Sequence, residues 1–332
     1  MKYIFFGTPQ FAVIILKALN EAGYKPALVI TTPDKPKGRG HTIAPPPVKI
    51  YAEKHTITVI QPATLKDQKI INTIAAFEPD LFIVAAYGKI IPKTILDIPK
   101  KGGLNIHPSL LPKYRGPSPI QAAILNGDKT TGVTIMLMDE EMDHGPMLAQ
   151  ATSNIQCQTQ SARFAKASAR RVIECWTAEK LSKKLAELGA QLLIETIPKW
   201  LADEITPRQQ DHSKATYTKI IAKEDGHIDW HKSAEEIERM VRAYTPWPSA
   251  WTLLNKDGKE LHVKILKAQT THAPPVSLPP STIIKQNSDL IVACGEGFLL
   301  IEEIQVEGGK PISGEEFLRG YSAVSAFLMM KA

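Results

Sequence analysis

The sequence predicts an α/β fold in which a mostly parallel sheet covered by helices is followed by a smaller β-barrel domain. In the first half, short apolar runs alternate with amphipathic helical stretches, which is typical of a parallel sheet covered by helices. In the second half, short β-like runs are separated by turn residues, which favours a small barrel. With 332 residues, the chain is long enough for two domains with substantial cores.

The first half begins with an apolar strand and continues as alternating strands and helices. Thr8 is the expected N-cap of the first helix and Pro9 its first residue, because both residue types favour these positions. The helical stretches carry the apolar stripe of helices that pack on a sheet. The expected strands are residues 2–6, 27–30, 81–86, 104–106 and 133–138, and the expected helices include residues 11–19, 66–77 and 120–125.

A long amphipathic helix over residues 179–201 closes the first domain, which we place at residues 1–202. The polar, proline-containing stretch 203–213 is typical of a linker. In the second domain, residues 214–332, a helix at 233–244 precedes the short strands. These strands are expected at residues 250–254, 261–267, 281–284, 290–293 and 298–305.

Composition excludes several classes of protein. The formal charge of +6 permits a polyanionic partner, but residues 207–332 carry 15 Lys and Arg against 16 Asp and Glu. A nucleic-acid surface there would need its positive charge gathered on one face. No apolar run approaches the ~20 residues of a membrane span, and the start of the chain resembles a strand rather than a secretory signal. The three widely spaced cysteines predict a reducing, cytoplasmic location, with neither a disulfide framework nor a zinc site.

The most informative stretch runs from Asn105 to Pro112. On a strand, residues i and i+2 face the same way, so Asn105 and His107 project together. Pro108 favours an extended backbone at His107, which places the imidazole at the strand end, where ligands of open α/β sheets bind. A carboxylate from Asp143 could hold the imidazole and favour its protonated form. The Asn105 amide could donate to a developing oxyanion, so the set suits acyl-type transfer, with a satisfied turn as the structural alternative.

A second candidate region is the long loop at residues 31–49, which is rich in proline, glycine and basic residues. Loops of this length are uncommon in compact domains and are usually functional or disordered. Lys35, Lys37 and Arg39 present charges suited to phosphate groups. Residues 7–10, by contrast, lack the later glycines of a dinucleotide fingerprint, so a nicotinamide cofactor is not expected.

These motifs resemble the folate-dependent formyltransferases, in which an Asn, a His and a later Asp form the transfer site. Residues 109–116 match this superfamily as a whole. The resemblance is closest to the methionyl-tRNA formyltransferases and covers nearly the whole chain; the stretches specific to them are residues 6–12, 33–40, 85–92, 132–136, 228–230 and 242–248. The family implies a Rossmann-like catalytic domain with helices on both faces, followed by an OB-like, tRNA-binding barrel. It also implies transfer of the formyl group of 10-formyltetrahydrofolate to the α-amine of methionine on initiator tRNA, with no metal. We expect a monomer with no membrane partner.

The resemblance also implies roles for individual residues. Asn105 and His107 would meet the oxyanion formed when the amine attacks the formyl carbon, and Asp143 would hold the imidazole. The basic loop around Arg39 would contact the tRNA acceptor arm. For Tyr87, a buried side chain with a satisfied hydroxyl is a more common outcome than a stacking platform. Two loops would line the folate site through backbone groups: Ser109, Leu110, Leu111 and Pro112 in one, and Tyr87, Gly88 and Ile90 in the other.

One segment departs from the family. Residues 157–176 replace a short connection with an Ala- and Arg-rich stretch, which we interpret as an inserted surface segment with helical character. In the second domain, Trp247 and Trp251 lie close to Pro246 and Pro248, and we expect them in the core rather than stacked on bases.

Two other functions remain open on the sequence alone. A folate formyltransferase that acts on a small amine would share Asn105, His107 and Asp143, although the basic loop and the second domain favour a macromolecular acceptor. A tRNA-binding protein without catalysis would have no need of this polar triad. Formylation of methionyl-initiator tRNA, measured against small amines, separates these functions.

Overall fold

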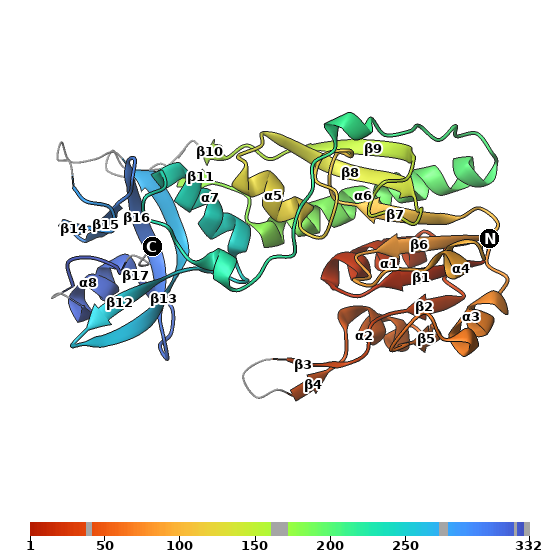
Figure 1. Ribbon diagram of the computed structural model, residues 1–332, viewed down its shortest axis with the longest axis horizontal. Helices are drawn as coiled ribbons and strands as arrows, with labels where there is room; N and C mark the ends of the chain where they lie inside the picture. Colours follow the sequence, from red (N-terminus) through yellow and green to blue (C-terminus); the bar gives the residue numbers. More distant parts are fainter. Residues whose placement is uncertain (38–41, 161–171, 272–277, 322–323, 329–332) are drawn as a thin grey trace. The chain divides into compact units, whose positions relative to one another are not determined.

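The computed structural model describes residues 1–37, 42–160, 172–271, 278–321 and 324–328 (Figure 1). The chain divides into two compact units. The first comprises Met1–Pro119, Thr130–Asn154 and Leu181–Lys219, and the second comprises Ile120–Lys129, Ile155–Lys180 and Ile220–Ala332. The stretch expected as a linker, 203–213, therefore lies within the first compact unit, and its role as a boundary stays a prediction.

A seven-stranded sheet forms the centre of the first unit, in the order β5-β2-β1-β6-β7-β8-β9. Neighbours from β5 to β7 are parallel, whereas β8 is antiparallel to both β7 and β9. The mostly parallel sheet expected from the sequence is confirmed, although β5 and β9 lie outside the expected strands. The bounds are β1 Tyr3–Gly7, β2 Leu28–Ile30, β5 Val59–Ile60, β6 Leu81–Ala85, β7 Gly103–His107, β8 Thr130–Leu137 and β9 Met147–Asn154.

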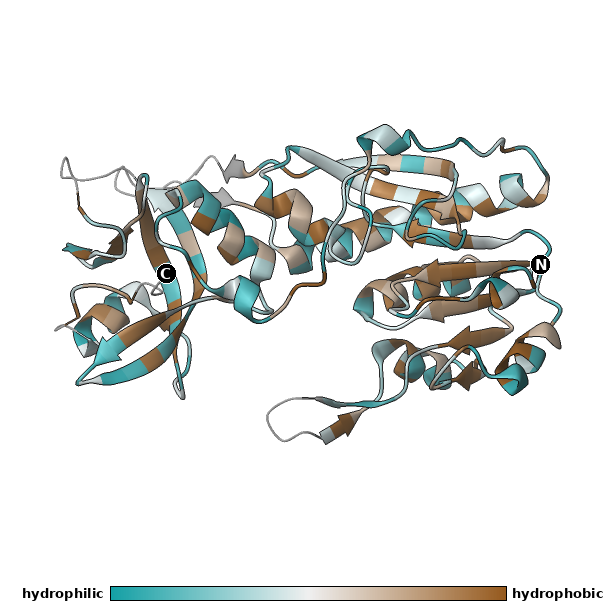
Figure 2. Cartoon of the chain, in the orientation of Figure 1, coloured by the Kyte–Doolittle hydropathy of each residue, from teal (hydrophilic) through white to brown (hydrophobic). Residues whose placement is uncertain are grey.

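Helices cover both faces of this sheet. Ile4 and Phe6 of β1 belong to a buried cluster that also contains Ile74 and Ile95 from two helices, and the intervening side chains point to the other face. On α6, an alanine Cβ at Gly189 would lie 2.8 Å from Ile106 of β7, so this helix packs closely against the sheet. Figure 2 shows the hydrophobic residues concentrated along β1, β2 and β6. The helices of this unit are α1 Gln10–Glu21, α2 Pro47–Lys54, α3 Gln68–Ala75, α4 Lys93–Leu96 and, from Leu181 onward, α6 Ala178–Leu201.

The start of α1 differs from the prediction. Pro9, not Thr8, is the N-cap residue, and no side chain caps the helix. The Thr8 hydroxyl instead donates to the carbonyl oxygen of Tyr87 at 2.9 Å. A long-range contact between two strand-end loops therefore replaces the local cap that the sequence favours.

Part of the long loop at residues 31–49 has regular structure. Strands β3 Lys35–Lys37 and β4 Thr42–Ala44 form an antiparallel hairpin. At its base, Asp34 accepts hydrogen bonds from Gln61 at 2.6 Å and from Lys49 at 2.9 Å. These hydrogen bonds, the one from Gln61 first, hold the pKa of Asp34 below its usual value. The hairpin is thus tied at its base to α2 and to the residue after β5.

The second unit contains a curled antiparallel sheet in the order β12-β13-β16-β15-β14, with β17 paired to β16. This arrangement confirms the expected small, barrel-like β domain. The helices α5, α7 and α8 also contribute to this unit, and the side chains of Ser233 and Glu236 form a capping box at α7. The bounds are β12 Ala250–Lys256, β13 Lys259–Thr271, β14 Ile283–Gln286, β15 Asp289–Ala293, β16 Phe298–Val306, β17 Ile312–Ser313, α5 Pro119–Leu125, α7 Ala234–Tyr244 and α8 Gly314–Gly320.

The two tryptophans of the second unit differ from the expectation that both lie in the core. Trp247 is 59% exposed and so lies outside the core, whereas Trp251 is partly buried and stacks on His262.

None of the helices in the described ranges combines the length and apolarity needed to cross a membrane.

The inserted segment is closed by a disulfide. Strands β10 Gln158–Gln160 and β11 Val172–Glu174 form an antiparallel pair, and Cys157 and Cys175 are bonded directly outside it. The expectations of no disulfide and of a helical segment were therefore wrong for the described ends of the insertion. Wide separation in the sequence hid the pairing, because only the hairpin register brings the two cysteines opposite each other. Residues 161–171 lie outside the described part of the chain.

Candidate active site

Strand β7 places two polar side chains at the edge of the first unit's parallel strands. Asn105 and His107 are two residues apart on β7, next to β8, where they pair with Met136 and Thr134. The face opposite these side chains carries Ile106, which α6 covers. The polar pair therefore lies on the face that α6 leaves free at this point of the strand.

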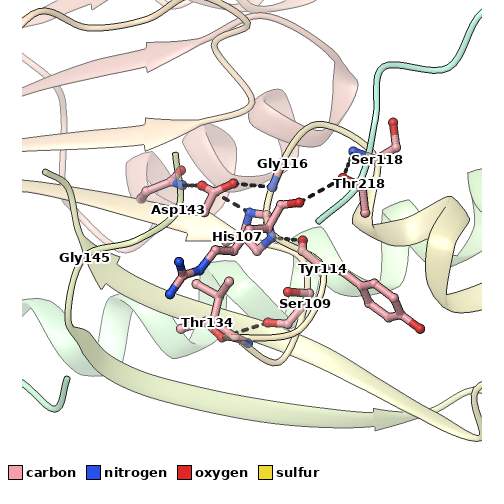
Figure 3. A network of polar contacts seen from close by, with 12 residues as sticks. His107, Ser109, Tyr114, Gly116, Ser118, Thr134, Asp143, Gly145 and Thr218 are labelled. Atoms are coloured by element: carbon pink, nitrogen blue, oxygen red, sulfur yellow. Dashed lines mark hydrogen bonds and ion pairs between the residues drawn. The ribbon is translucent and has the colours of Figure 1, made fainter. Parts of the chain in front are cut away.

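A single carboxylate contacts both of these side chains (Figure 3). Asp143 lies between β8 and β9, and its Oδ1 accepts a hydrogen bond from Asn105 Nδ2 at 3.1 Å and lies 3.5 Å from His107 Nδ1. Its other oxygen, Oδ2, accepts a hydrogen bond from the backbone N–H of Gly116 at 2.7 Å. The structure thus brings Asp143 into contact with Asn105 and His107, although Asp143 follows Asn105 by 38 positions in the sequence.

The surroundings of His107 determine which ring nitrogen is available. Nε2 lies 2.9 Å from the carbonyl oxygen of Tyr114, and since a carbonyl can only accept, Nε2 carries a hydrogen and donates it. Nδ1 is therefore the nitrogen that faces Asp143. The His107 side chain is only 5% exposed and that of Asp143 only 14%, so water screens their interaction weakly.

The loop that follows His107 is fixed by a buried hydroxyl. Thr134 Oγ1 donates to the carbonyl oxygen of Ser109 at 2.7 Å and accepts from the N–H of Leu111 at 3.1 Å. The carbonyl oxygens of Leu110, Leu111 and Pro112 also accept hydrogen bonds from within the chain. A ligand that contacts these carbonyls would share them with the protein, which a carbonyl oxygen allows because it has two lone pairs.

The second loop expected at the folate site contains residues with very different exposure. Tyr87 is 2% exposed, and its ring packs edge-on against Phe6 with centroids 5.4 Å apart. Its hydroxyl has no hydrogen-bond partner among the described residues, and burial raises the pKa of Tyr87 to about 12. Its ring is thus a core side chain rather than a stacking surface. Gly88 has a positive φ of 82°, and Ile90 is 83% exposed.

The basic residues predicted to bind phosphates lie in or near the β3–β4 hairpin. Lys35 is exposed on β3, and Lys37 ends the same strand. Arg39 lies outside the described residues. Burial, and to a smaller extent the charge of Lys35, lowers the pKa of Lys89, whose ammonium donates to the carbonyl oxygens of Pro62 and Ala63.

Sequence reasoning missed several groups that hold this site. The N–H of Gly116 and the carbonyl of Tyr114 lie in the stretch 109–116 that resembles the family, but the sequence gives no signal of the role of a backbone group. Gln210 is 4% exposed and donates to the carbonyl oxygens of Asp143 and Gly145 at 2.9 and 2.8 Å. It lies in the polar stretch expected as a linker, where no apolar pattern indicates burial.

The arrangement has the groups needed for acyl transfer. An amide and an imidazole lie on one strand face, and a carboxylate held by a backbone N–H connects them. Such groups can move a proton and stabilise a developing oxyanion. Among the described residues, no group of three or more His, Cys, Asp or Glu side chains is arranged to hold a metal ion.

Comparison with known proteins identifies the family. Residues 1–171 match the family described as formyl transferase, and residues 220–322 match its C-terminal domain. The chain is 44% identical to the methionyl-tRNA formyltransferase of Chloroflexus aurantiacus over 97% of this chain and 98% of that protein. The corresponding protein of Citrifermentans bemidjiense is 40% identical over 100% of this chain and 97% of its own length. The chain belongs to the methionyl-tRNA formyltransferase family.

Solved structures of formyltransferases share the fold at low sequence identity. An N-formyltransferase from Helicobacter canadensis, in complex with folinic acid and dTDP-3-aminofucose, has a TM-score of 0.59 at 20% identity and covers 91% of this chain and 98% of its own. HypX from Aquifex aeolicus, in complex with tetrahydrofolic acid, has a TM-score of 0.61 at 16% identity and covers 96% of this chain and 47% of its own. At these identities the likeness bears on the fold alone.

Proposed function

We propose that this chain transfers the formyl group of 10-formyltetrahydrofolate to the α-amine of methionyl-initiator tRNA, which serves translation initiation. The observation that carries the proposal is the likeness of 40–44% identity, over nearly the full length of both chains, to methionyl-tRNA formyltransferases. The clustered Asn105, His107 and Asp143 supply groups suited to this chemistry. The folate is a co-substrate, and the proposal includes no metal.

The proposed reaction is a direct transfer through a tetrahedral intermediate. The lone pair of the amine forms a bond to the formyl carbon, and the carbonyl electron pair moves to oxygen. When the intermediate collapses, the bond from carbon to the folate nitrogen breaks. The amine loses a proton and the folate nitrogen gains one, so the reaction is balanced without an added reagent.

Each polar group of the candidate site has a proposed role in this reaction. Asn105 Nδ2 has two hydrogens, of which one is held by Asp143, and the other is suited to the oxyanion. His107 Nδ1 is the ring nitrogen not committed to a carbonyl, so it is the proposed site of proton transfer. Asp143 orients the ring and offsets its positive charge when it is protonated. General acid–base catalysis of this kind contributes roughly 10²–10⁴-fold.

The binding roles are proposals as well. Ser109, Leu110, Leu111 and Pro112, with Tyr87, Gly88 and Ile90, line the folate site mainly through their backbones. Lys35, Lys37 and Arg39 contact tRNA phosphates, and the second domain, residues 214–332 after the linker 203–213, binds the tRNA body. The exposure of Lys35 and the formal charge of +6 support this assignment. We further propose that the protein acts as a cytoplasmic monomer.

A substrate comparison tests the proposed function. The purified chain and 10-formyltetrahydrofolate are mixed either with methionyl-initiator tRNA or with a nucleotide-linked amino sugar, and kcat/KM is measured for each acceptor. We expect kcat/KM for the tRNA to be larger by at least about 10³-fold, because only the tRNA engages the basic loop and the second domain. A preference for the amino sugar would establish the small-amine alternative instead.

A further inference from the structure

Asp143 has a backbone conformation that needs external support. Its φ is 52°, in the left-handed region that residues other than glycine seldom adopt. The N–H of Gly116 holds its carboxylate but does not fix its main chain. Gln210 does so, because its single amide group donates to the carbonyl oxygens of both Asp143 and Gly145, at 2.9 and 2.8 Å. One side chain thus links the carbonyl groups of the two residues on either side of His144.

The orientation of the Gln210 amide is determined by a buried arginine. Gln210 Oε1 accepts hydrogen bonds from Arg115 Nε at 3.1 Å and from Arg115 Nη2 at 2.9 Å. A guanidinium can only donate and a backbone carbonyl can only accept, so Oε1 must face Arg115 and Nε2 must face the turn. Arg115 is 1% exposed and Gln210 is 4% exposed, so water does not compete effectively for these bonds.

Arg115 is in turn held on both sides by a segment distant in sequence. Its N–H donates to the carbonyl oxygen of Thr216, and its carbonyl accepts from the N–H of Thr218, both at 2.8 Å. Its guanidinium also donates to Tyr217 and to His212 Nδ1, at 3.2 and 2.7 Å. The next residue after Arg115 is Gly116, whose N–H binds the Asp143 carboxylate. The backbone pairing of Arg115 with residues 216–218 therefore positions both the Asp143 carboxylate, through Gly116, and the Gln210 side chain, through Arg115.

We propose that Gln210, oriented by Arg115, is a positioning residue for Asp143: it holds the 143–145 turn so that Oδ1 faces Asn105 and His107. The segment 203–219 then completes the active site from a stretch that the sequence presents as a linker. This inference rests on the proposed function, since it takes Asp143 as the group that acts on His107.

The test uses Gln210→Met, which keeps the length of the side chain and removes its donors and acceptor. We expect kcat for methionyl-tRNA formylation to fall roughly 10- to 100-fold, with both KM values within about threefold of wild type, because only the geometry of the reacting groups changes. Gln210→Glu keeps acceptors for Arg115 and loses both donors, so it should show the same loss; it serves as the second variant if the first does not fold. Gln68→Met, an identical change at an exposed position on α3, is the matched control.

A double variant separates positioning from general damage to the structure. If Gln210 acts through Asp143, Gln210→Met should lower kcat by less than about twofold in an Asp143→Asn background, whereas independent effects multiply. Wild-type kcat in Gln210→Met, or multiplying losses in the double variant, would overturn the inference.

Hydrogen exchange gives a readout that does not depend on activity. Backbone amides of residues 138–145 should exchange more than about tenfold faster in Gln210→Met than in wild type or Gln68→Met, because the turn loses two of its hydrogen bonds. Unchanged exchange would contradict the inference even in an active enzyme. A wild-type chain that does not formylate methionyl-tRNA would instead refute the proposed function, and the two failures are thus distinguishable.

Discussion

The carboxylate oxygen Asp143 Oδ1 contacts both the amide of Asn105 and the imidazole of His107, and this explains why these two residues are spaced two positions apart on β7. Asn105 and His107 can both reach one oxygen only because residues two positions apart on a strand lie on the same face. Asp143 Oδ2 is already bound to the N–H of Gly116, so the carboxylate has little freedom to turn away. The catalytic proposal therefore depends on the geometry of three side chains rather than on any one of them.

A second observation at the residue scale is the buried hydroxyl of Tyr87. It has no partner among the described residues, and burial raises its pKa from 10.0 to about 12. The folded state thus favours the protonated phenol, so stability is intact below pH 10 and is lost as the pH rises from 10 toward 12. The loss attributable to this group is on the order of 2 kcal/mol.

Tyr87→Phe should therefore change the alkaline stability of the protein. At neutral pH we expect the free energy of unfolding to stay the same or to rise slightly, because the variant removes a buried polar group that lacks a partner. Between pH 10 and 12 the variant should lose less stability than wild type. Urea unfolding at pH 7, 10 and 11.5 measures both effects; a clear destabilisation at pH 7 would mean that the hydroxyl has a partner after all.

At the scale of elements, β8 has to approach both its neighbour strand and the loop after His107. At Gly132 an added Cβ would overlap the carbonyl oxygen of Ala151 on β9 and would lie 2.5 Å from Leu110 Cδ2. Backbone oxygens in a sheet cannot move aside cheaply, so the close approach depends on glycine.

We expect Gly132→Ala to destabilise the protein by at least about 2 kcal/mol, through strain of the kind that overpacking produces. Because Leu110 belongs to the loop proposed to line the folate site, KM for 10-formyltetrahydrofolate should rise as well. Gly320→Ala is the control, since nothing lies within 4 Å of its added Cβ, and it should alter stability by less than about 0.5 kcal/mol. Equal effects of the two substitutions in denaturant unfolding would contradict the packing argument.

Much of the element pattern could be predicted from the sequence, and the failures have physical causes. The apolar runs of β1, β6 and β8 and the stripe of α6 follow from burial alone. The prediction of Thr8 as N-cap was wrong because the tertiary fold places the carbonyl oxygen of Tyr87 within hydrogen-bond distance of the Thr8 hydroxyl. The short strands β3 and β4 contain polar and proline residues, so local composition could not distinguish them from a loop.

For the candidate site, the side chains proposed to take part in the reaction could be predicted from the sequence, whereas the residues that hold them in place could not. Asn105, His107 and Asp143 stand out because their types and spacing suit one reaction. Gln210 and Arg115 are buried polar groups that satisfy each other, and such pairs leave no periodic trace in the sequence. The Cys157–Cys175 bond was missed for a similar reason, because its partners meet only through a hairpin register.

At the scale of the whole molecule, a formal charge of +6 indicates how a polyanion would be attracted. The charge is not uniform, since residues 1–206 carry 25 Lys and Arg against 18 Asp and Glu. The proposed tRNA contacts at Lys35, Lys37 and Arg39 lie in this basic part. Binding through phosphates releases counterions, so KM for the tRNA should rise with salt far more than KM for the folate.

Lys35→Ala tests this contribution. We expect KM for methionyl-initiator tRNA to rise several-fold and the slope of log KM against log salt concentration to decrease by about 1, with KM for the folate unchanged. Lys17→Ala, which removes the same charge from an exposed position on α1, is the matched control and should alter KM less than about twofold. Indistinguishable salt slopes for the two variants would argue against a phosphate contact at Lys35.

The central claim is that Asn105, His107 and Asp143 transfer the formyl group as one unit, and the rate of transfer in Asp143→Asn tests it most directly. The rate constant is measured in a single turnover, with 10-formyltetrahydrofolate and methionyl-initiator tRNA bound at saturation. We predict a decrease of roughly 10²–10⁴-fold relative to wild type, with folate affinity within about threefold, because the amide cannot offset the charge of a protonated imidazole. A variant that transfers the formyl group at nearly the wild-type rate would contradict the account.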